Sequence, residues 1–454
     1  MDLNLNIVKY FAHKLGIDKA ISYTLLTQIF GILRSLVVII LVTKFLTATE
    51  QGFSYTFGSI LAIQVFFELG FSGIITQYAA YERANLTWQG NILEGDEMYQ
   101  SRLNSLLHLT AKWFSVMTFL LFVTLLVGGF AFFYYFSPKY EDVNWQLPWI
   151  LMATTTALNL FVSPALAFYE GLGKVDRTAK LRFYSLFFTT VVFFIALCLN
   201  TKLYAFAFNS IAGLIVNIVW LFSPSIRETF THVFHYEIRK YTISWREEIF
   251  PYQWKIALSW MSGYFLFQLF NPILFSTVGA KAAGQMGMTQ AALGGIFALA
   301  NSWFSTKVPL FSNLISLKKY TQLDNLFAKT IKQALIVMTG SLFVLFVIIG
   351  LVNYLKYNIG GRFLEPLPFI ILGLSSVILF TTGSLGVYLR CHKEEPFLIL
   401  SLVSGSVNAL LLYFTSKYFG ITGMVCGYFV VMLISLIGGY NIFINKKKVW
   451  HDNQ

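Results

Sequence analysis

The chain has 454 residues, of which 56% are hydrophobic, 18% aromatic and only 12% charged, with a mean hydropathy of +0.65. Soluble domains carry roughly 25% charged residues, so this composition excludes an ordinary soluble enzyme or binding module and indicates a polytopic membrane protein. The formal net charge of +12 is predicted to sit in short loops that face anionic lipid headgroups, and not on a surface for nucleic acid.

The first segment, residues 1–19, predicts a short amphipathic helix that lies on the cytoplasmic membrane surface. Its apolar residues Ile7, Val8, Phe11 and Leu15 share one helical face. The segment has no apolar core of the signal-peptide type, so no cleavage is expected.

Twelve transmembrane helices are predicted from the rule that about twenty apolar residues cross the hydrocarbon layer. They cover approximately 20–43, 53–75, 111–135, 147–170, 182–199, 203–222, 254–277, 284–311, 331–354, 364–389, 396–416 and 420–444. The predicted fold class is therefore an all-α integral membrane protein. The fifth and sixth spans are joined by only Asn200-Thr201-Lys202, so a re-entrant pair is an alternative for this region.

The predicted domains follow from these spans. An N-terminal six-helix bundle, 20–222, is followed by a cytoplasmic linker, 223–253, a C-terminal six-helix bundle, 254–445, and a basic tail, 446–454. Aromatic residues near the end of the linker, such as Trp245, are interspersed with basic ones, which predicts an interfacial helix there.

The positions of Lys and Arg predict the orientation, because cytoplasmic loops retain positive charge. Arg34 and Lys307 fall inside spans, and most of the other 31 of the 33 basic residues fall in segments on the side of the N-terminus. Only seven fall on the opposite side: Lys44, Lys139, Lys202, Lys281, Lys356, Arg362 and Lys417. Both termini are therefore predicted to be cytoplasmic.

Catalytic and metal-binding functions are not indicated. The outer loops are short, and Gly171-Leu-Gly-Lys174 lacks the upstream glycine and the following Ser or Thr of a phosphate-binding loop. The three cysteines lie far apart in or beside apolar runs. His232, His235 and Glu237 lack a further ligand at a suitable spacing, so they are interpreted as surface residues. The chain is predicted not to be an enzyme and to need no cofactor.

The stretch Gly279–Asn313 has a weaker copy near the start of the chain. With a shift of 232 residues, Gly284 falls on Gly52 and Trp303 on Phe71, and in the preceding helix Gly263 falls on Gly31. Two halves of the chain therefore repeat one plan.

These residues also carry a resemblance to a known family. In the second half they are the Gly284-Gln285 entry and the Trp303-x-x-x-Lys307-x-Pro309 exit, and in the first half Glu50-Gln51-Gly52, Glu68-Leu69-Gly70-Phe71 and Thr76-Gln77. Together these stretches resemble the Wzx-like polysaccharide flippases of the MATE-like MOP transporter superfamily. The resemblance implies two bundles that rock about a central cavity. It further implies a substrate, undecaprenyl-diphosphate-linked oligosaccharide, which is moved from the cytoplasmic to the outer leaflet of the bacterial cytoplasmic (inner) membrane for O-antigen, capsule or similar polysaccharide biosynthesis.

Charge inside the membrane is where function is expected to concentrate, since an ionisable side chain there costs roughly 2.5–3.5 kcal/mol on insertion scales. Arg34 lies well inside the first span. It is interpreted either as a cavity-facing cation that attracts an anionic group or as one half of a structural ion pair.

Glu68, in the second span, is the predicted partner of Arg34, although a vertical gap of roughly 10 Å leaves a direct pair, a water-mediated pair and a state-dependent pair open. A protonatable Glu68 is one hypothesis for coupling to H⁺, and a structural carboxylate is the other. Coupling to Na⁺ also stays open.

Three cations at cytoplasmic helix ends, Lys307, Arg390 and Lys174, are interpreted as topology signals or as contacts to a phosphate at the entrance. Asn301 and other amides within spans either line a sugar-accepting cavity or hydrogen-bond between helices. The predicted substrate path is Arg34, Glu68, Lys307, Arg390, Lys174, Asn301 and Gln77. Asn271-Pro272 predicts a break in the seventh helix.

The main alternative is a MATE-type multidrug or small-molecule extruder driven by Na⁺ or H⁺, which shares the fold. A pump for organic cations is expected to gather acidic residues in its cavity, whereas here Glu68 is the one intramembrane acid among cations. A lipid II flippase needs two additional helices, and a membrane glycosyltransferase or polymerase needs longer outer loops. The expected partners are the lipid-linked substrate, membrane lipids and other polysaccharide-assembly membrane proteins, with no nucleic acid.

Overall fold

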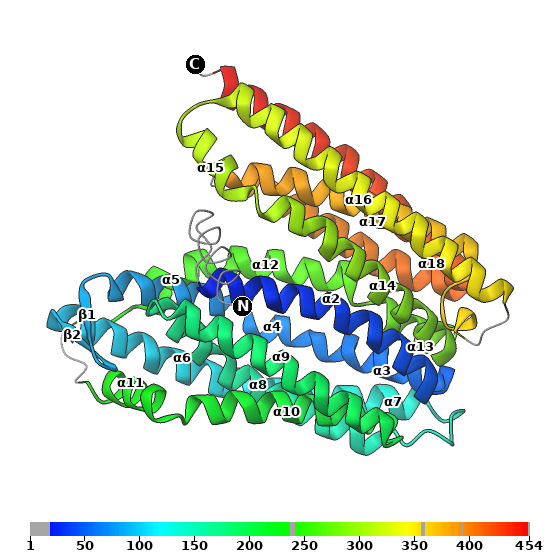
Figure 1. The fold of residues 1–454 in the computed structure, drawn as a ribbon, viewed down its shortest axis with the longest axis horizontal. Helices are drawn as coiled ribbons and strands as arrows, with labels where there is room; N and C mark the ends of the chain where they lie inside the picture. Colours follow the sequence, from blue (N-terminus) through cyan, green and yellow to red (C-terminus); the bar gives the residue numbers. More distant parts are fainter. Residues whose placement is uncertain (1–18, 237–240, 356–358, 393, 453–454) are drawn as a thin grey trace, which may run out of the picture. The chain divides into compact units, whose positions relative to one another are not determined.

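The computed structural model describes residues 19–236, 241–355, 359–392 and 394–452. These residues are mainly helical, with one two-stranded hairpin (Figure 1). All of the predicted amphipathic segment except Lys19 lies outside the described residues, so that helix stays a prediction.

Two compact units are formed by the described chain. Unit 1 draws on the described parts of Met1–Arg34, Ile63–Tyr135 and Asn144–Ala257, and unit 2 on those of Ser35–Ala62, Phe136–Val143 and Leu258–Gln454. The long helices α2 (Lys19–Phe45) and α12 (Phe250–Phe267) contribute to both units. The bundles predicted from chain order are a different division, and their boundaries stay a prediction.

Unit 1 is built mainly of helices that pack side by side along their lengths. They are α4 (Val65–Glu68), α5 (Phe71–Arg83), α6 (Glu97–Thr124), α7 (Phe130–Phe136), α8 (Gln146–Gly171), α9 (Val175–Cys198), α10 (Tyr204–Leu221) and α11 (Pro224–His235). A π-helical stretch, Leu125–Gly129, joins α6 to α7. Helix α8 packs against α5, α6 and α10, and α9 packs against α10 (Figure 1). The hairpin of β1 (Leu86–Gln89) and β2 (Ile92–Gly95) lies between α5 and α6 in the chain.

Unit 2 contains α3 (Ala48–Leu61), α13 (Phe270–Thr277), α14 (Ala280–Ser305), α15 (Val308–Ser316), α16 (Tyr320–Tyr354), α17 (Pro366–Cys391) and α18 (Leu398–Asp452). Helix α18 is two helical segments that meet at Gly420, where φ is 63°. The chain also has a break between α12 and α13, directly before Asn271 and Pro272. The predicted break in the seventh helix is therefore confirmed, since proline is accepted in a first helical turn but not in a helix interior.

Eight described helices or joined helices are long and apolar enough to cross a membrane, and the bent pair Ala48–Glu68 and Phe71–Arg83 makes a ninth candidate. The predicted spans 254–277 and 284–311 are also helical, as α12 with α13 and α14 with α15, but each is interrupted. The total of twelve spans and the orientation of the termini stay predictions.

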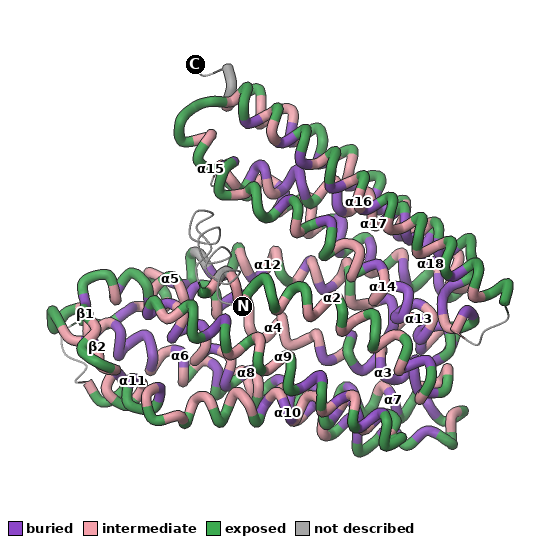
Figure 2. Tube along the Cα trace, in the orientation of Figure 1, coloured by how far each residue is buried: buried purple, intermediate pink, exposed green. Residues whose placement is uncertain are grey.

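Exposed apolar surface agrees with a lipid environment for these helices. Only 6% of the most apolar part of Ser22–Phe45 is buried, and 11% of that of Tyr320–Tyr354 (Figure 2). A helix that is apolar all round and not covered by protein is typical of a membrane span. The chain is therefore a multi-pass membrane protein by length, composition and surface.

The tight turn between the predicted fifth and sixth spans is confirmed. Helices α9 and α10 are both long enough to cross a membrane, and Asn200 and Lys202 between them take left-handed conformations with φ of 56° and 54°. Two left-handed residues reverse the chain within a few positions, which lets two complete helices lie side by side.

The segment between the predicted second and third spans, for which the sequence predicts no element, is helical at both ends with a hairpin between. Helix α5 continues to Arg83, the hairpin follows, and α6 begins at Glu97, where the side chain of Asp96 accepts a hydrogen bond from the Met98 amide at 2.8 Å. A search for apolar windows detects only the part of a helix inside the hydrocarbon, so it missed the polar first turns of α6. The hairpin was missed because its strands are only four residues long.

A very close helix approach in unit 2 joins the two glycines that the repeat aligned. A Cβ added to Gly52 in α3 would overlap the carbonyl oxygen of Ala280 in α14. Conversely, a Cβ added to Gly284 would lie 3.1 Å from the carbonyl oxygen of Ala48 and 2.9 Å from the amide nitrogen of Gly52. The two contacts are reciprocal under the shift of 232 residues, which supports the predicted internal repeat.

Polar contacts fix the beginning of α3 beside this crossing. Thr47 and Glu50 form a capping box, in which each side chain accepts a hydrogen bond from the other residue's backbone amide. The buried amide of Gln51 donates to the Gly284 carbonyl at 2.8 Å, and Arg362 donates to the Leu46 carbonyl at 2.6 Å. The capping box and the Arg362 bond satisfy backbone groups at the beginning of α3 and just after α2, which lack partners within the helix, whereas the Gln51 bond joins α3 to α14.

A glycine pair in α3 tests this crossing. We expect Gly52→Ala to lower the free energy of unfolding by about 1–3 kcal/mol, because the added methyl overpacks a backbone contact. Gly58→Ala is the matched control, since nothing lies within 4 Å of its Cβ position and alanine favours a helix interior. Thermal unfolding of both variants in detergent makes the measurement. Equal melting temperatures for the two variants would contradict the close crossing.

Candidate functional site

Arg34 lies in the middle of α2, about 22 Å from its first residue and about 16 Å from its last along the helix axis. Exposed apolar residues, among them Ile29, Leu33 and Leu36, cover one side of this helix. Arg34 is half-buried, and its Nη2 donates a hydrogen bond to Oδ1 of Asn209 in α10 at 3.1 Å. Its partner is a neutral amide, so the hydrogen bond leaves the positive charge of the guanidinium uncompensated.

Helix α10 carries a second amide that faces a neighbouring helix. Asn217 donates to Oδ1 of Asn159 in α8 at 3.2 Å. The Asn159–Asn217 pair fits the interpretation that amides within spans form hydrogen bonds between helices. Asn209, in contrast, bonds a charged side chain. Helix α10 thus makes two separate polar contacts inside unit 1, one to α2 and one to α8.

Glu68 is the last residue of α4, at a break in the helix. Leu69 and Gly70 follow with φ of 51° and 66°, and α5 begins at Phe71, bent by 42° from the preceding helix. Broken helices at membrane depth are common where a transporter binds its substrate or ion. Among the described residues no ion pair joins Glu68 to Arg34. A water-mediated or state-dependent pair stays a prediction.

The three predicted entrance cations have different surroundings. Lys174 lies just before α9, and its Nζ is 4.0 Å from the ring centroid of Trp88 in β1. Burial, followed by the charge of Arg177, lowers the pKa of Lys174. Lys307 is exposed at the break between α14 and α15, and Arg390 pairs with Glu395 at 3.3 Å. Lys174 belongs to unit 1 and the other two to unit 2.

The two remaining residues of the predicted path are exposed amides. Asn301 lies near the end of α14 in unit 2. Gln77 lies in α5 and lines a cavity of unit 1 whose volume is about 600 Å³. The role of each in a substrate path stays a prediction.

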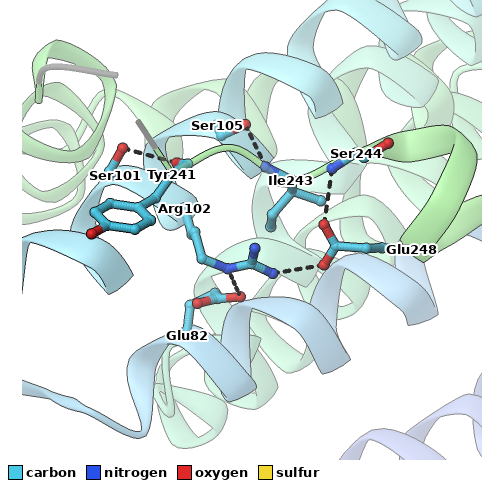
Figure 3. Close-up of polar contacts among 8 residues, drawn as sticks. All are labelled: Glu82, Ser101, Arg102, Ser105, Tyr241, Ile243, Ser244 and Glu248. Atoms are coloured by element: carbon cyan, nitrogen blue, oxygen red, sulfur yellow. Dashed lines mark hydrogen bonds and ion pairs between the residues drawn. The ribbon is translucent and has the colours of Figure 1, made fainter. Parts of the chain in front are cut away.

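Sequence reasoning missed a cluster of charged residues centred on Arg102 in α6. Its guanidinium bonds the carboxylate of Glu82 in α5 at 2.9 Å and that of Glu248 at 2.7 Å (Figure 3). Burial alone would raise the pKa of Glu248, but hydrogen bonds from Arg102 and from the Ser244 amide outweigh burial and hold that pKa below its usual value. The partners are distant in sequence, so no local motif announces the cluster.

The same face of α6 holds the linker between the predicted bundles. Ser101 donates to the Tyr241 carbonyl at 2.9 Å, and the Ile243 amide donates to Ser105 Oγ at 3.1 Å (Figure 3). The buried amide of Asn104 donates to backbone carbonyls at the end of α11. The predicted interfacial helix near Trp245 is a short π-helical stretch, Trp245–Ile249, that runs directly into α12.

The cysteines and histidines add no further site within the described residues. Cys198, Cys391 and Cys426 are free thiols. Glu237, named with His232 and His235 in the sequence, lies outside the described residues. Among the residues that the structure describes, no group of three or more His, Cys, Asp and Glu side chains is placed to hold a metal ion.

The Arg102 cluster yields a pH-dependent prediction. We expect Arg102→Ala to lower the free energy of unfolding by about 2 kcal/mol at pH 7, because Glu82 and Glu248 lose a charged donor. A carboxylate whose folded-state pKa is lowered adds stability above its unfolded pKa of about 4.3, and that stability is lost as the pH falls through the folded value. The deficit of Arg102→Ala should therefore shrink between pH 7 and pH 4.

Thermal unfolding of the wild type and the variant at both pH values measures this effect. Arg182→Ala is the control, since the Arg182 side chain is 54% exposed in its pair with Glu170 and such surface pairs contribute less than about 1 kcal/mol. A deficit that is equally large at pH 7 and pH 4 would contradict the role of Arg102 as a charged partner.

Comparisons with known proteins give a fold but no sequence family. No family model and no curated protein matches the sequence. Solved structures match over nearly the whole chain. One is an inward-facing multidrug resistance MATE family transporter of the MOP superfamily, with 14% sequence identity and a TM-score of 0.62. The match covers 93% of this chain and 99% of that transporter's chain. The MATE multidrug transporter DinF-BH shares 13% identity, with 95% and 96% covered and a TM-score of 0.60.

A MOP superfamily transporter from Pyrococcus furiosus also matches, with 14% identity, 95% of this chain and 96% of that chain covered, and a TM-score of 0.55. It is described as having a binding pocket of reverse polarity that suggests a different function. At these identities the likeness concerns the fold alone. The described chain has the fold of MATE transporters of the MOP superfamily.

Proposed function

We propose that this protein is an alternating-access transporter that flips an undecaprenyl-diphosphate-linked oligosaccharide from the cytoplasmic to the outer leaflet for surface polysaccharide biosynthesis. The observation that carries the proposal is Arg34, a half-buried cation at mid-span that is bound to the neutral amide of Asn209. A charge at this depth costs roughly 2.5–3.5 kcal/mol on insertion scales, so its retention favours a functional role. A diphosphate group is the anionic partner that such a cation suits.

The fold supports the mechanism. MATE transporters of the MOP superfamily are the structural neighbours, and the repeat that relates Gly52 to Gly284 is of the kind on which alternating access is built. In this proposal Lys174, Lys307 and Arg390 meet the diphosphate at the cytoplasmic entrance, and Arg34 holds it later. Asn301 and Gln77 contact the polar head, and the apolar tail stays in lipid.

A MATE-type multidrug extruder is the second candidate, because two of the neighbours described above are multidrug transporters. Such a protein would move organic cations, for which a carboxylate is the suitable partner. The mid-span charge bound to Asn209 has the opposite sign. The sign of this charge, together with the family resemblance of the sequence, makes the flippase the preferred function.

Translocation in proteoliposomes tests the proposed function directly. We expect Arg34→Ala to reduce translocation of a lipid-diphosphate-linked oligosaccharide to the level of protein-free vesicles, because the anionic group loses its mid-span counter-charge, and Arg34→Lys to retain part of it. The readout is the fraction of glycan accessible to a glycosidase on the far side. Lys44→Ala removes a cation from the exposed end of the same helix and should transport normally.

The amount of protein in the vesicle membrane is measured in parallel, so that loss of insertion is separated from loss of transport. Normal translocation by Arg34→Ala would refute the role of Arg34. If the wild type moves no glycolipid but exports an organic cation dye along an ion gradient, the protein is an extruder.

Glu68 yields a separate prediction on the driving force. If a proton gradient drives the cycle through this carboxyl, Glu68→Gln should transport at the same rate with and without a gradient, whereas the wild type is accelerated by it. Glu141→Gln is the control, since Glu141 is exposed in the loop after α7. A Glu68→Gln variant that is still accelerated like the wild type would show that Glu68 is structural.

A further inference from the structure

The cavity that Gln77 lines has a composition that the proposed path does not account for. It lies in unit 1, between the end of α5 and the beginning of α6, with a volume of about 600 Å³. This volume falls within the ~300–1,000 Å³ range of small-molecule sites. Its lining includes the aromatic rings of Tyr81 and Tyr99, the amides of Gln77 and Asn85, and the ion pair of Glu82 and Arg102.

The cavity lies outside the hydrocarbon layer. Residues 97–136 form one helical run of 40 residues, about 60 Å long, whereas the hydrocarbon is about 30 Å thick. The lining residues of α6 belong to its first two turns, which carry Glu97 and Arg102, and a further charge at Lys112 precedes the apolar part. A ligand in the cavity is therefore reached from water, on the side that the distribution of Lys and Arg predicts to be cytoplasmic.

The aromatic and amide groups of the cavity are available to a ligand. Tyr81 is 75% exposed, so its ring is open to a ligand. Gln77 and Asn85 are exposed, and neither side-chain amide bonds another residue of the described chain. Together they offer an apolar ring face beside donors and acceptors of hydrogen bonds.

The two charged residues that line the cavity, Glu82 and Arg102, are paired with each other, which restricts the ligand. The carboxylate of Glu82 and the guanidinium of Arg102 are 2.9 Å apart, and Arg102 also bonds Glu248 (Figure 3). Nε and Nη2 of Arg102 are thus already held by carboxylates, and Glu82 has its own counter-ion. An anionic phosphate would have to compete with two carboxylates for Arg102, and each carboxylate that an organic cation would approach is already bonded to Arg102.

We propose that this cavity binds the saccharide part of the lipid-linked substrate, an inference that rests on the proposed function. A pyranose has one face of C–H bonds, which packs on the π-face of an aromatic ring such as that of Tyr81, and a rim of hydroxyls, which bond amides such as Gln77 and Asn85. The cavity therefore holds the glycan in water while the lipid remains in the membrane. It selects substrates that carry a glycan.

The test is binding of soluble sugars to the full-length protein in detergent, measured by saturation-transfer NMR. The probes are methyl glycosides of hexoses and of N-acetylhexosamines, with inorganic pyrophosphate and tetraphenylphosphonium as the charged alternatives. We expect transfer to at least one glycoside, reduced at least fivefold in Tyr81→Ala and retained in Tyr81→Phe, which keeps the ring. Tyr354→Ala is the matched control, since Tyr354 is also highly exposed, at 84%, but lies in α16 of unit 2.

Three outcomes overturn the inference. They are transfer to no glycoside, transfer that Tyr81→Ala leaves unchanged, and preferential binding of pyrophosphate or tetraphenylphosphonium that Tyr81→Ala abolishes. Translocation of glycolipid by the wild type with no sugar binding would refute the saccharide site and leave the proposed function intact. Sugar binding that depends on Tyr81, without any glycolipid translocation, would refute the proposed function alone.

Discussion

The contact between Gly52 of α3 and Gly284 of α14 is the constraint on which the arrangement of unit 2 depends. Each glycine lies against the backbone of the other helix, four residues before the opposite glycine, at Ala280 and Ala48. No side chain fits between two backbones at such an approach, and small residues at a crossing are the usual means by which membrane helices come this close. The contact also brings the amide of Gln51 within hydrogen-bond distance of the Gly284 carbonyl. A repeat detected as weak similarity in the sequence is thus a reciprocal packing contact in the fold.

Two kinds of charge govern the rest of the molecule, and they differ in how they are compensated. Arg102 is bonded to two carboxylates near the beginning of α6, and one of them, Glu248, lies in Trp245–Ile249. Asn104 of the same helix holds the end of α11. Arg34 is bonded to one neutral amide in the middle of α2. A cluster of paired charges is typical of a structural role, because removing one partner leaves the other as an unpaired charge, which is costly where it is buried. A cation with only a neutral partner is not neutralised by the protein, which is why we propose that Arg34 attracts the anionic group of the substrate.

The sequence predicted the parts of this structure that depend on apolar length and on backbone chemistry. The helical membrane fold, the tight turn at Asn200 and Lys202, the break before Asn271 and the equivalence of Gly52 with Gly284 all follow from local residue properties. The Arg102 cluster and the cavity beside it were missed because their partners come from three segments, and nothing local to Glu82 or Glu248 distinguishes them from other surface acids. The hairpin at 86–95 was missed for a similar reason, since its strands are too short to show a pattern.

The proposed substrate has three chemically different parts, and unit 1 offers a different surface to each. The glycan is neutral and polyhydroxylated, which suits a cavity of tyrosine rings and amides whose two charged residues are paired with each other. The diphosphate is anionic, which suits Arg34. The polyprenyl tail is apolar, which suits the exposed Leu and Ile residues on the outer side of the same α2 helix. An organic cation would require the opposite sign at mid-span and would leave the neutral cavity without a purpose, so one amphipathic glycolipid accounts for more of these features than a small cationic drug does.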